Sequence, residues 1–408
     1  MKNLVGLEYS DKLYKKYATL SRQVNENFIN IHPIQRGGVL TPEAQKVLLE
    51  YGDGYSLCDN CLKGRIDLIK NPPIDEFLID FAKFIDMDNA MPTGAARDAK
   101  RMAITALKER FPERKTVIID SLAHYSTYLA IELNKLKIKE VPNSGDTYFE
   151  INPEDYRTKI EEVKKEEGVT PLLVLLTHVD YQYGNYNDPK PIGDISKEYD
   201  VPFLLNAAYS AGILPVFGRE LGVDLLSCSG HKSMAASGPI GMLGFSDEFV
   251  DNILVPSKIH GDLTDRSFSG KFCNFLGCPP VYGAPMMTLM ASFPSVVKRT
   301  QKNVVEDEQK KINFVVEEIS KIKGIEVLGK LPKIHPLTHI KTESFNEVAK
   351  SHKRRGFFVR DEFKKRGILG MAPGISKNMK FNTYGLTWDQ VKTFANAFLD
   401  IAEKYDLL

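Results

Sequence analysis

Short apolar runs recur along the chain, and each is followed by small or polar residues. The clearest examples are Thr116–Asp120, Leu172–Thr177, Pro202–Asn206 and Val223–Leu226. Runs of this length, bounded by turn residues, are typical of strands that are buried on both faces. Because helical segments separate them, the pattern predicts an α/β fold, and in such folds ligands bind where the strands end.

The run Val223–Leu226 leads, after a break predicted at Gly230, to His231 and Lys232. A buried cation is costly without a partner, so a lysine just past a buried strand contributes little to packing. The same position suits a lysine that forms a Schiff base with an aldehyde. For a His-Lys pair taken alone, a surface lysine in a loop is the alternative.

Three other stretches favour the hypothesis that Lys232 forms a Schiff base. They are Met91–Arg97, whose small residues open a helix, His124–Tyr125, and Asn206–Ala208. In order and spacing, these stretches and Lys232 resemble the large domain of fold-type-I pyridoxal-phosphate (PLP) enzymes. The resemblance covers the segment from the small-residue turn to the lysine.

This resemblance implies the fold of the aspartate aminotransferase-like transferases. We expect an N-terminal arm over residues 1–40 and a large PLP-binding domain over 41–296, with a mostly parallel seven-stranded sheet. A smaller C-terminal α+β domain is expected over 297–408. The composition changes at that boundary, where charged helices begin to alternate with short strands and turns.

The resemblance also implies which residues contact the cofactor. Unpaired N–H groups and the macrodipole at the start of the helix after Gly94 suit a phosphate. His124 is expected to stack on the ring, and Asn185, just after a strand, is a candidate partner of the ring hydroxyl. The expected contacts are Ala96, Arg97, His124, Asn185, Asn206, Ala208, Ser229, His231 and Lys232.

Asn206 departs from the pattern of many relatives, which have aspartate at that position. Asparagine can form a hydrogen bond to the pyridine nitrogen but carries no charge, so the ring is a weaker electron sink. This argues against transamination and decarboxylation, in which a carbanion must persist. It is compatible with a β-elimination, in which the electrons leave promptly with the leaving group.

Five cysteines are too few for a disulfide scaffold in a chain of 408 residues. The spacing of Cys58 and Cys61 brings two sulfurs within reach of each other. A structural zinc site needs a second pair of cysteines at this spacing. The remaining cysteines, Cys228, Cys273 and Cys278, do not form such a pair. A redox or persulfide site is expected instead, with two unremarkable loop cysteines as the alternative.

Further motifs narrow the resemblance. Ser56–Gly64, Ser229–Met234, Leu276–Cys278 and Met290–Pro294, together with the departure at Asn206, resemble the O-phosphoseryl-tRNA:cysteinyl-tRNA synthase family over nearly the whole chain. Membership implies conversion of O-phosphoseryl-tRNA(Cys) to cysteinyl-tRNA(Cys), by PLP-dependent β-elimination of phosphate and then addition of sulfur from a cysteine persulfide. It also implies a homodimer that works beside the phosphoseryl-tRNA synthetase, and it leaves the sulfur donor unidentified.

By the same resemblance, Lys232 removes the α-proton, and Arg97 and His124 face the substrate. Three cysteines are expected in the site. Two of them match Cys58 and Cys61.

The third site cysteine matches Cys278 better than Cys273, because Leu276 and Gly277 precede it. One thiolate would deliver sulfur and another would resolve the S–S bond. The alternative use of Cys58, Cys61 and Cys278 is as ligands of an iron–sulfur cluster; otherwise no metal is expected.

Two other functions are open at this point. A cysteine desulfurase or lyase acting on free amino acids would share the fold and the persulfide. Such enzymes usually have the aspartate that Asn206 replaces. A non-catalytic scaffold in a tRNA-charging complex is the second, and the intact Lys232 argues against it.

The net charge of +1 means that any contact with nucleic acid must come from a local patch. Lys353–Arg355 and Lys364–Arg366 are two such clusters, and they are either contacts to RNA phosphates or solvated helix ends. No apolar run has the roughly 18 residues of a membrane span, and Met1–Val5 does not begin a signal peptide. We therefore expect a cytoplasmic protein without a membrane partner.

Overall fold

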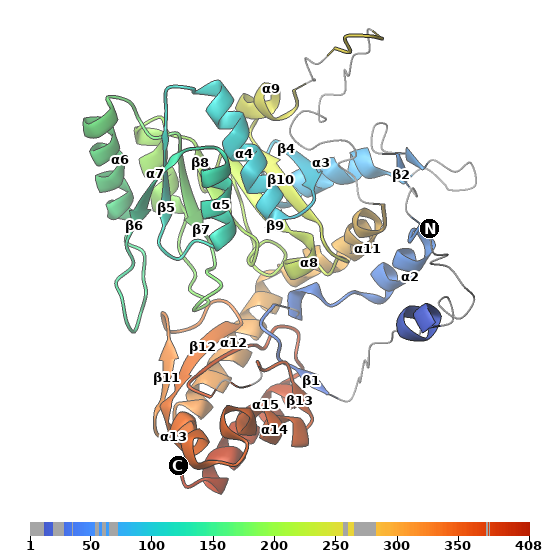
Figure 1. Ribbon diagram of the computed structural model, residues 1–408, viewed down its shortest axis with the longest axis vertical. Helices are drawn as coiled ribbons and strands as arrows, with labels where there is room; N and C mark the ends of the chain where they lie inside the picture. The colour runs from blue at the N-terminus through green and yellow to red at the C-terminus, as the bar shows by residue number, and fades with distance from the viewer. Residues whose placement is uncertain are drawn as a thin grey trace, which may run out of the picture.

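The computed structural model describes residues 12–18, 28–34, 36–53, 72–255, 260–264, 283–372, 374 and 376–408. It also gives the backbone of two short paired strands, β2 (Leu57–Cys58) and β3 (Lys63–Gly64). A large α/β part and a smaller C-terminal part lie one above the other (Figure 1). Among the described residues, no helix combines the length and the apolar character that crossing a membrane requires.

The large part is built on a seven-stranded sheet, which confirms the predicted fold class. Only one strand, β10, is antiparallel to its neighbours. The spatial order is β4 (Asn89–Thr93), β10 (Gly241–Phe245), β9 (Leu225–Ser229), β8 (Phe203–Asn206), β7 (Leu173–Thr177), β5 (Thr116–Asp120) and β6 (Lys137–Val141).

The strands at the centre of this sheet are buried along their whole length, as short apolar runs predict. Helices cover both faces of the sheet and complete one continuous apolar core (Figure 1). The helices of this part are α2 (Pro42–Glu50), α3 (Ile74–Phe84), α4 (Ala96–Arg110), α5 (Tyr125–Leu133), α6 (Pro153–Glu167), α7 (Lys190–Glu198), α8 (Gly230–Ser233), α9 (Val250–Ile253) and α11 (Gly283–Arg299).

Strand β9 differs from the expectation that placed it at Val223–Leu226. It runs from Leu225 to Ser229, and its backbone pairs with β8 on one side and β10 on the other. The small side chains of Ser227 and Cys228 are fully buried there. Apolar runs report which side chains are buried, whereas strand length depends on backbone pairing, so the small residues were left out of the predicted strand.

The C-terminal part is α+β, as predicted. Its antiparallel sheet has the order β11 (Ile325–Leu328), β12 (Leu337–Thr342) and β14 (Asn378–Asn382). Its helices are α12 (Lys302–Ile319), α13 (Glu343–Ser351), α14 (Phe358–Lys365) and α15 (Trp388–Lys404).

The N-terminal segment contributes to this C-terminal part. Strand β1 (Ile29–Asn30) pairs in parallel with β13 (Ile368–Leu369), and Ile31 is buried in the same apolar cluster (Figure 1). Short 3-10 or π turns complete the described chain at Tyr14–Ala18, Arg36–Gly38, Asp247–Phe249 and Arg355–Phe357.

A buried histidine joins the two parts. The side chain of His335 is 0% exposed. Its Nε2 donates to the carbonyl oxygen of Tyr209 in the large part at 3.0 Å, and its Nδ1 accepts from the backbone N–H of Leu337 at 3.1 Å. Burial lowers the pKa of His335 to about 4, so the ring is neutral at neutral pH.

This histidine predicts a loss of stability in acid. Between its unfolded pKa near 6.5 and the folded value near 4, the unfolded chain binds a proton that the folded chain does not. The contribution of His335 to the free energy of unfolding is therefore fully present above pH 6.5. It is lost as the pH falls toward 4, and the loss is on the order of 3 kcal/mol.

His335→Gln is expected to remove this pH-dependent part of the free energy of unfolding, because glutamine keeps a donor for the Tyr209 carbonyl but does not titrate. Urea unfolding at pH 4.5 and pH 7.5 measures the difference in the free energy of unfolding. The exposed His260 provides the control, as His260→Asn. An equal pH dependence in His335→Gln and the wild type would contradict the prediction.

Candidate active site

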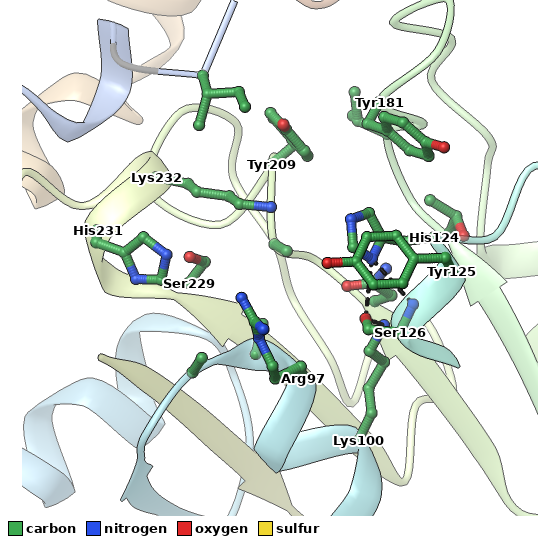
Figure 2. Close-up of a pocket in the computed structure, with 17 residues that line it drawn as sticks. Arg97, Lys100, His124, Tyr125, Ser126, Tyr181, Tyr209, Ser229, His231 and Lys232 are labelled. Carbon is green, nitrogen blue, oxygen red and sulfur yellow. Dashed lines mark hydrogen bonds between the residues drawn. The ribbon is translucent and has the colours of Figure 1, made fainter. Parts of the chain in front are cut away.

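A cavity of about 330 Å³ lies at the carboxyl ends of the parallel strands. Each strand that reaches it is followed by residues that form its wall, which is the usual arrangement of ligand sites in open α/β sheets. Figure 2 shows these side chains converging from different elements. The lining residues include Ala96, Arg97, His124, Asn206, Ala208, Ser229, His231 and Lys232, so eight of the nine expected cofactor contacts meet here.

Lys232 extends from α8 into this cavity, which we call the inner cavity (Figure 2). Its Nζ lies 4.7 Å from the ring centroid of Tyr209. Burial, and secondarily the charge of Arg97, lowers the pKa of the Lys232 amine. A larger share of the amine is therefore neutral, as a nucleophile or a base requires.

The position of α8 is fixed by the segment that precedes α2. A Cβ on Gly38 would lie 2.2 Å from the carbonyl oxygen of His231, so only glycine allows this approach. The guanidinium of Arg299 donates to the carbonyl oxygens of Gly37 and Ser233, at 3.2 Å each. These contacts tie the turn that carries Lys232 to α11 and the N-terminal segment.

The opposite wall is the start of α4. Its N-cap, Ala95, supplies no side-chain hydrogen bond to the first turn. A Cβ on Gly241 of β10 would lie 2.5 Å from the backbone nitrogen of Ala96, so the strand packs directly against this helix start. Arg97 points from here toward Lys232 (Figure 2). Uncapped N–H groups next to a guanidinium suit an anion.

The third wall is a hydrogen-bonded group around His124. The Nδ1 of His124 accepts from the backbone N–H of Ser126 at 3.2 Å and lies 2.9 Å from the Ser126 hydroxyl. The Nζ of Lys100 donates to that hydroxyl at 3.0 Å and to the hydroxyl of Thr127 at 2.7 Å. Burial lowers the pKa of Lys100 to about 7.

These contacts set the state of the imidazole. Burial, and then the charge of Lys100, lowers the pKa of His124 to about 4, so the ring is neutral at neutral pH. Because Nδ1 accepts a backbone hydrogen bond, the ring proton is on Nε2. His124 therefore offers a flat neutral ring and one N–H donor.

Asn206 lies at the base of the cavity and is 5% exposed. Its Oδ1 accepts from the hydroxyl of Ser227 at 3.3 Å. With Oδ1 engaged in this way, the amide N–H₂ is the group that can donate to a ligand. An uncharged amide donor suits a ring nitrogen that carries no proton.

One buried hydroxyl of the cavity wall, Ser229 Oγ, has no hydrogen-bond partner in the described part of the chain. Buried polar atoms are nearly always paired, so this hydroxyl is suited to a polar group of a ligand in the cavity. An anion site, a primary amine and a flat wall, all within one cavity, fit PLP.

The expectation for Asn185 is wrong. Its amide nitrogen donates to the backbone carbonyls of Tyr148 and Phe149 at 2.8 and 3.2 Å, and its Oδ1 accepts from the backbone N–H of Lys330 at 2.7 Å. Asn185 is buried and lines a different hollow. Every hydrogen-bonding atom of its amide is used in joining segments of the fold.

The expected cysteine site lies largely outside the described residues. Cys61, Cys273 and Cys278 are not described, and of Cys58 only the backbone, in β2, is described. Cys228 is fully buried in β9, and burial raises the pKa of its thiol. Within the described residues, no three His, Cys, Asp or Glu side chains are grouped as metal ligands.

Several residues that line the cavity were not among the cofactor contacts predicted from the sequence, although Ala95 and Tyr125 lie within stretches singled out there. Lys100 follows Arg97 by about one helical turn, a spacing that could have identified it. The others are Ile34, Ala95, Tyr125, Ser126, Thr177, Val179, Tyr181 and Tyr209. Most of them follow a strand end within a few residues, which was the available signal.

The two basic clusters of the C-terminal part border a common hollow. Much of their charge is already paired. Glu362, 4% exposed, accepts from Lys365, Arg366 and Lys404, and Arg354 pairs with Asp361 at 2.7 Å. The unpaired charge available to an RNA phosphate is therefore smaller than the sequence suggests.

The chain is similar to known proteins over nearly all of its length. Residues 89–407 match the model of the O-phosphoseryl-tRNA(Sec) selenium transferase family, SepSecS. The O-phospho-L-seryl-tRNA:Cys-tRNA synthase 2 of Archaeoglobus fulgidus is 48% identical over 94% of this chain and 96% of its own. The O-phospho-L-seryl-tRNA:Cys-tRNA synthase of Methanocaldococcus jannaschii is 46% identical over 95% of this chain and 99% of its own.

Solved structures agree with this similarity. A crystal structure of the complex of SepCysS with the SepCysE N-terminal domain contains a chain 44% identical to this one, with a TM-score of 0.85 over 96% of this chain and 99% of the other. A cysteine desulfurase from Thermococcus onnurineus has a TM-score of 0.70 at 17% identity, over 92% of this chain and 95% of its own. That second likeness shows the fold.

Proposed function

This chain belongs to the O-phospho-L-seryl-tRNA:Cys-tRNA synthase family, and from that premise we propose how its residues convert O-phosphoseryl-tRNA to cysteinyl-tRNA. The single observation that carries the proposal is the inner cavity, where the Lys232 amine faces an anion site at the start of α4. We propose that the protein acts as a PLP-dependent transferase, which the family and the cavity around Lys232 support.

The residues of the cavity would hold PLP in a defined way. Lys232 would bind its aldehyde carbon, and the first turn of α4 with Ser229 would bind its phosphate. His124 would stack on the ring, Ala208 would leave room on the ring face, and Asn206 would donate to the ring nitrogen. When bound, PLP withdraws electrons from the α-carbon of a joined amino acid, which favours loss of its proton and of a β-substituent.

Side chains of the protein accept the α-proton and provide the positive charge that faces the leaving phosphate. Lys232, with its lowered pKa, accepts the α-proton on Nζ. The phosphate that leaves the β-carbon is anionic, and the guanidinium of Arg97 is directed into the same space (Figure 2). His124 can donate Nε2–H to that phosphate. With no charge on Asn206, elimination is favoured over reactions that need a long-lived carbanion.

Sulfur addition is proposed to use Cys58, Cys61 and Cys278. The terminal sulfur of a persulfide on one cysteine bonds to the β-carbon, which gives a mixed disulfide. The thiolate of a second cysteine attacks the enzyme's sulfur, forms an enzyme disulfide and releases the cysteinyl thiolate. Sulfide from an external donor then attacks the enzyme disulfide, which restores the persulfide on one cysteine and releases the other cysteine as a thiolate. Iron and acid-labile sulfide analysis separates this use from an iron–sulfur cluster.

We further propose a cytoplasmic homodimer that works beside the phosphoseryl-tRNA synthetase. The family resemblance supports this. The described surface supports it as well, because Tyr125, Leu129 and Leu133 form an exposed apolar stripe along α5, next to the inner cavity. Light scattering should give twice the chain mass of 45.9 kDa.

A turnover assay tests the function. The protein with PLP is given phosphoseryl-tRNA or free O-phosphoserine together with sulfide, and in a separate reaction free cysteine together with a dithiol. We expect cysteinyl-tRNA and inorganic phosphate only from phosphoseryl-tRNA. Release of sulfide from free cysteine, with no action on the charged tRNA, would contradict the proposal and identify a desulfurase.

A further inference from the structure

A second, larger cavity opens beside the inner cavity. This outer cavity measures about 850 Å³, against about 330 Å³ for the inner one. Ile34, Tyr181 and Tyr209 line both, so the two cavities are adjacent and share these residues as a common wall. The outer cavity is formed between the large part, the N-terminal segment and the C-terminal part, and its remaining walls come from β12, α14, β13, β14 and the loop after β13.

The size of the inner cavity limits what it can hold. A cofactor and a phosphoseryl group would occupy it, yet the substrate continues through an ester bond into the ribose of the last nucleotide of the tRNA. That nucleotide must lie directly outside the inner cavity. The outer cavity is there, and its volume is within the roughly 300–1,000 Å³ that small-molecule sites have.

One wall of the outer cavity is apolar. It presents the partly exposed side chains of Leu369 and Met371, and the buried core residues Phe363, Ile368 and Met379 pack behind them. Methionine and aliphatic side chains adapt to a flat ring, and burying the face of a base against such a wall is favourable. No hydrogen bond to a particular base is needed for this contact.

The polar groups of the outer cavity suit a nucleotide. The Nδ1 of His339 is 2.9 Å from the carbonyl oxygen of Gln182, which can only accept, so Nδ1 donates and Nε2 can accept from a hydroxyl or amino group. Burial lowers the pKa of His339 to about 4, which keeps this acceptor at neutral pH. The Nζ of Lys380 donates to the carbonyl oxygen of Tyr181, at 2.8 Å, on the wall that both cavities share.

Arg360 provides a cation at the outer cavity. It is exposed, lies on α14 and lines the cavity. Unlike Arg354 and Arg366 in the same region, it takes part in no ion pair among the described residues. A guanidinium in this setting is suited to bind a phosphodiester through two parallel hydrogen bonds.

We propose that the outer cavity binds the 3′-terminal nucleotide of the tRNA substrate, with its base on the apolar wall and its 5′-phosphodiester on Arg360. The proposal rests on the proposed function and deepens it. The nucleotide holds the ester in place so that the phosphoseryl group enters the inner cavity. This arrangement makes the attached nucleotide, rather than the amino acid alone, the basis of substrate selection.

Two variants test this site, Arg360→Gln and Ala372→Trp. Ala372 lines the cavity and is exposed, so a tryptophan there fills space without disturbing the core. We expect each to raise KM for phosphoseryl-tRNA about tenfold while kcat changes little, Arg360→Gln through loss of a charged hydrogen bond and Ala372→Trp because the indole occupies the space of the base. Binding of O-phosphoserine methyl ester, which lacks the nucleotide, to the holoenzyme should be unchanged, as followed by the absorbance of the cofactor. Lys392→Gln, an exposed cation of α15 outside the cavity, is the control.

A binding measurement supplies a readout apart from turnover. Adenosine 5′-monophosphate should compete with a fluorescent acceptor-stem RNA for the wild-type holoenzyme, and about tenfold more weakly for Arg360→Gln. Unchanged KM and unchanged competition in both variants would overturn the proposal. So would an equal loss with the methyl ester, or a change in oligomeric state without a change in KM. Absence of turnover by the wild type on phosphoseryl-tRNA would instead overturn the proposed function.

Discussion

Replacing Lys232 by alanine is expected to lower turnover of phosphoseryl-tRNA by roughly a thousandfold or more, because in the proposed function this one residue supplies both the covalent attachment and the base. The amine of Lys232 is directed into the inner cavity and has a lowered pKa. Alanine keeps the short helix α8 and removes only that amine. Folding should therefore be retained while the reaction is lost.

The measurement has two parts. Cysteinyl-tRNA formation gives the rate, and mass spectrometry after borohydride reduction shows whether PLP is covalently attached. Both signals should disappear in Lys232→Ala. Lys197→Ala removes an exposed lysine of α7 and should keep both. Substantial turnover by Lys232→Ala would mean that another group acts as the base.

Replacing Phe394 by alanine is expected to destabilise the C-terminal part by about 3–5 kcal/mol, the cost of truncating a buried aromatic residue. Phe394 is 0% exposed on α15. Its ring centroid lies 5.1 Å from that of Phe381, 5.2 Å from that of Phe398 and 6.0 Å from that of Phe363. The variant removes all three contacts and leaves a cavity.

Urea unfolding followed by circular dichroism measures this loss. Phe357→Ala serves as the matched control, because Phe357 is 45% exposed in the same part of the chain. It should change the free energy of unfolding by less than about 1 kcal/mol. Equal effects of the two substitutions would show that the aromatic cluster does not stabilise the C-terminal part.

The residues around Lys232 in the inner cavity could be predicted from the sequence because of a simple geometric rule. Parallel strands end at the same edge of a sheet, so residues that follow different strands meet there. Asn206, Ser229 and Lys232 are each within a few residues of a strand end, and all reach the inner cavity. The rule needs only the positions of the strands along the chain, which the apolar runs supply.

Asn185 shows where that rule fails. It too follows a strand end, but the carboxylate of Asp180 accepts from the backbone N–H groups of Gln182, Tyr183 and Asn185, at 2.6 to 2.8 Å. These bonds close a turn that directs Asn185 toward Tyr148 and away from the inner cavity. Such a turn depends on one buried side chain, which no strand pattern reveals.

The sequence by itself determined the α/β class and the position of Lys232 after a strand end, because apolar runs and the residues that follow them are local properties of the chain. The order of the strands within the sheet was decided by the tertiary structure. The tertiary structure alone decided the pairing of β1 with β13, the network from Lys100 to His124 and the outer cavity. Each of these depends on contacts between segments far apart in sequence or on the packing of two parts. Their side chains become neighbours only when the chain folds, and local sequence patterns do not predict contacts between distant segments.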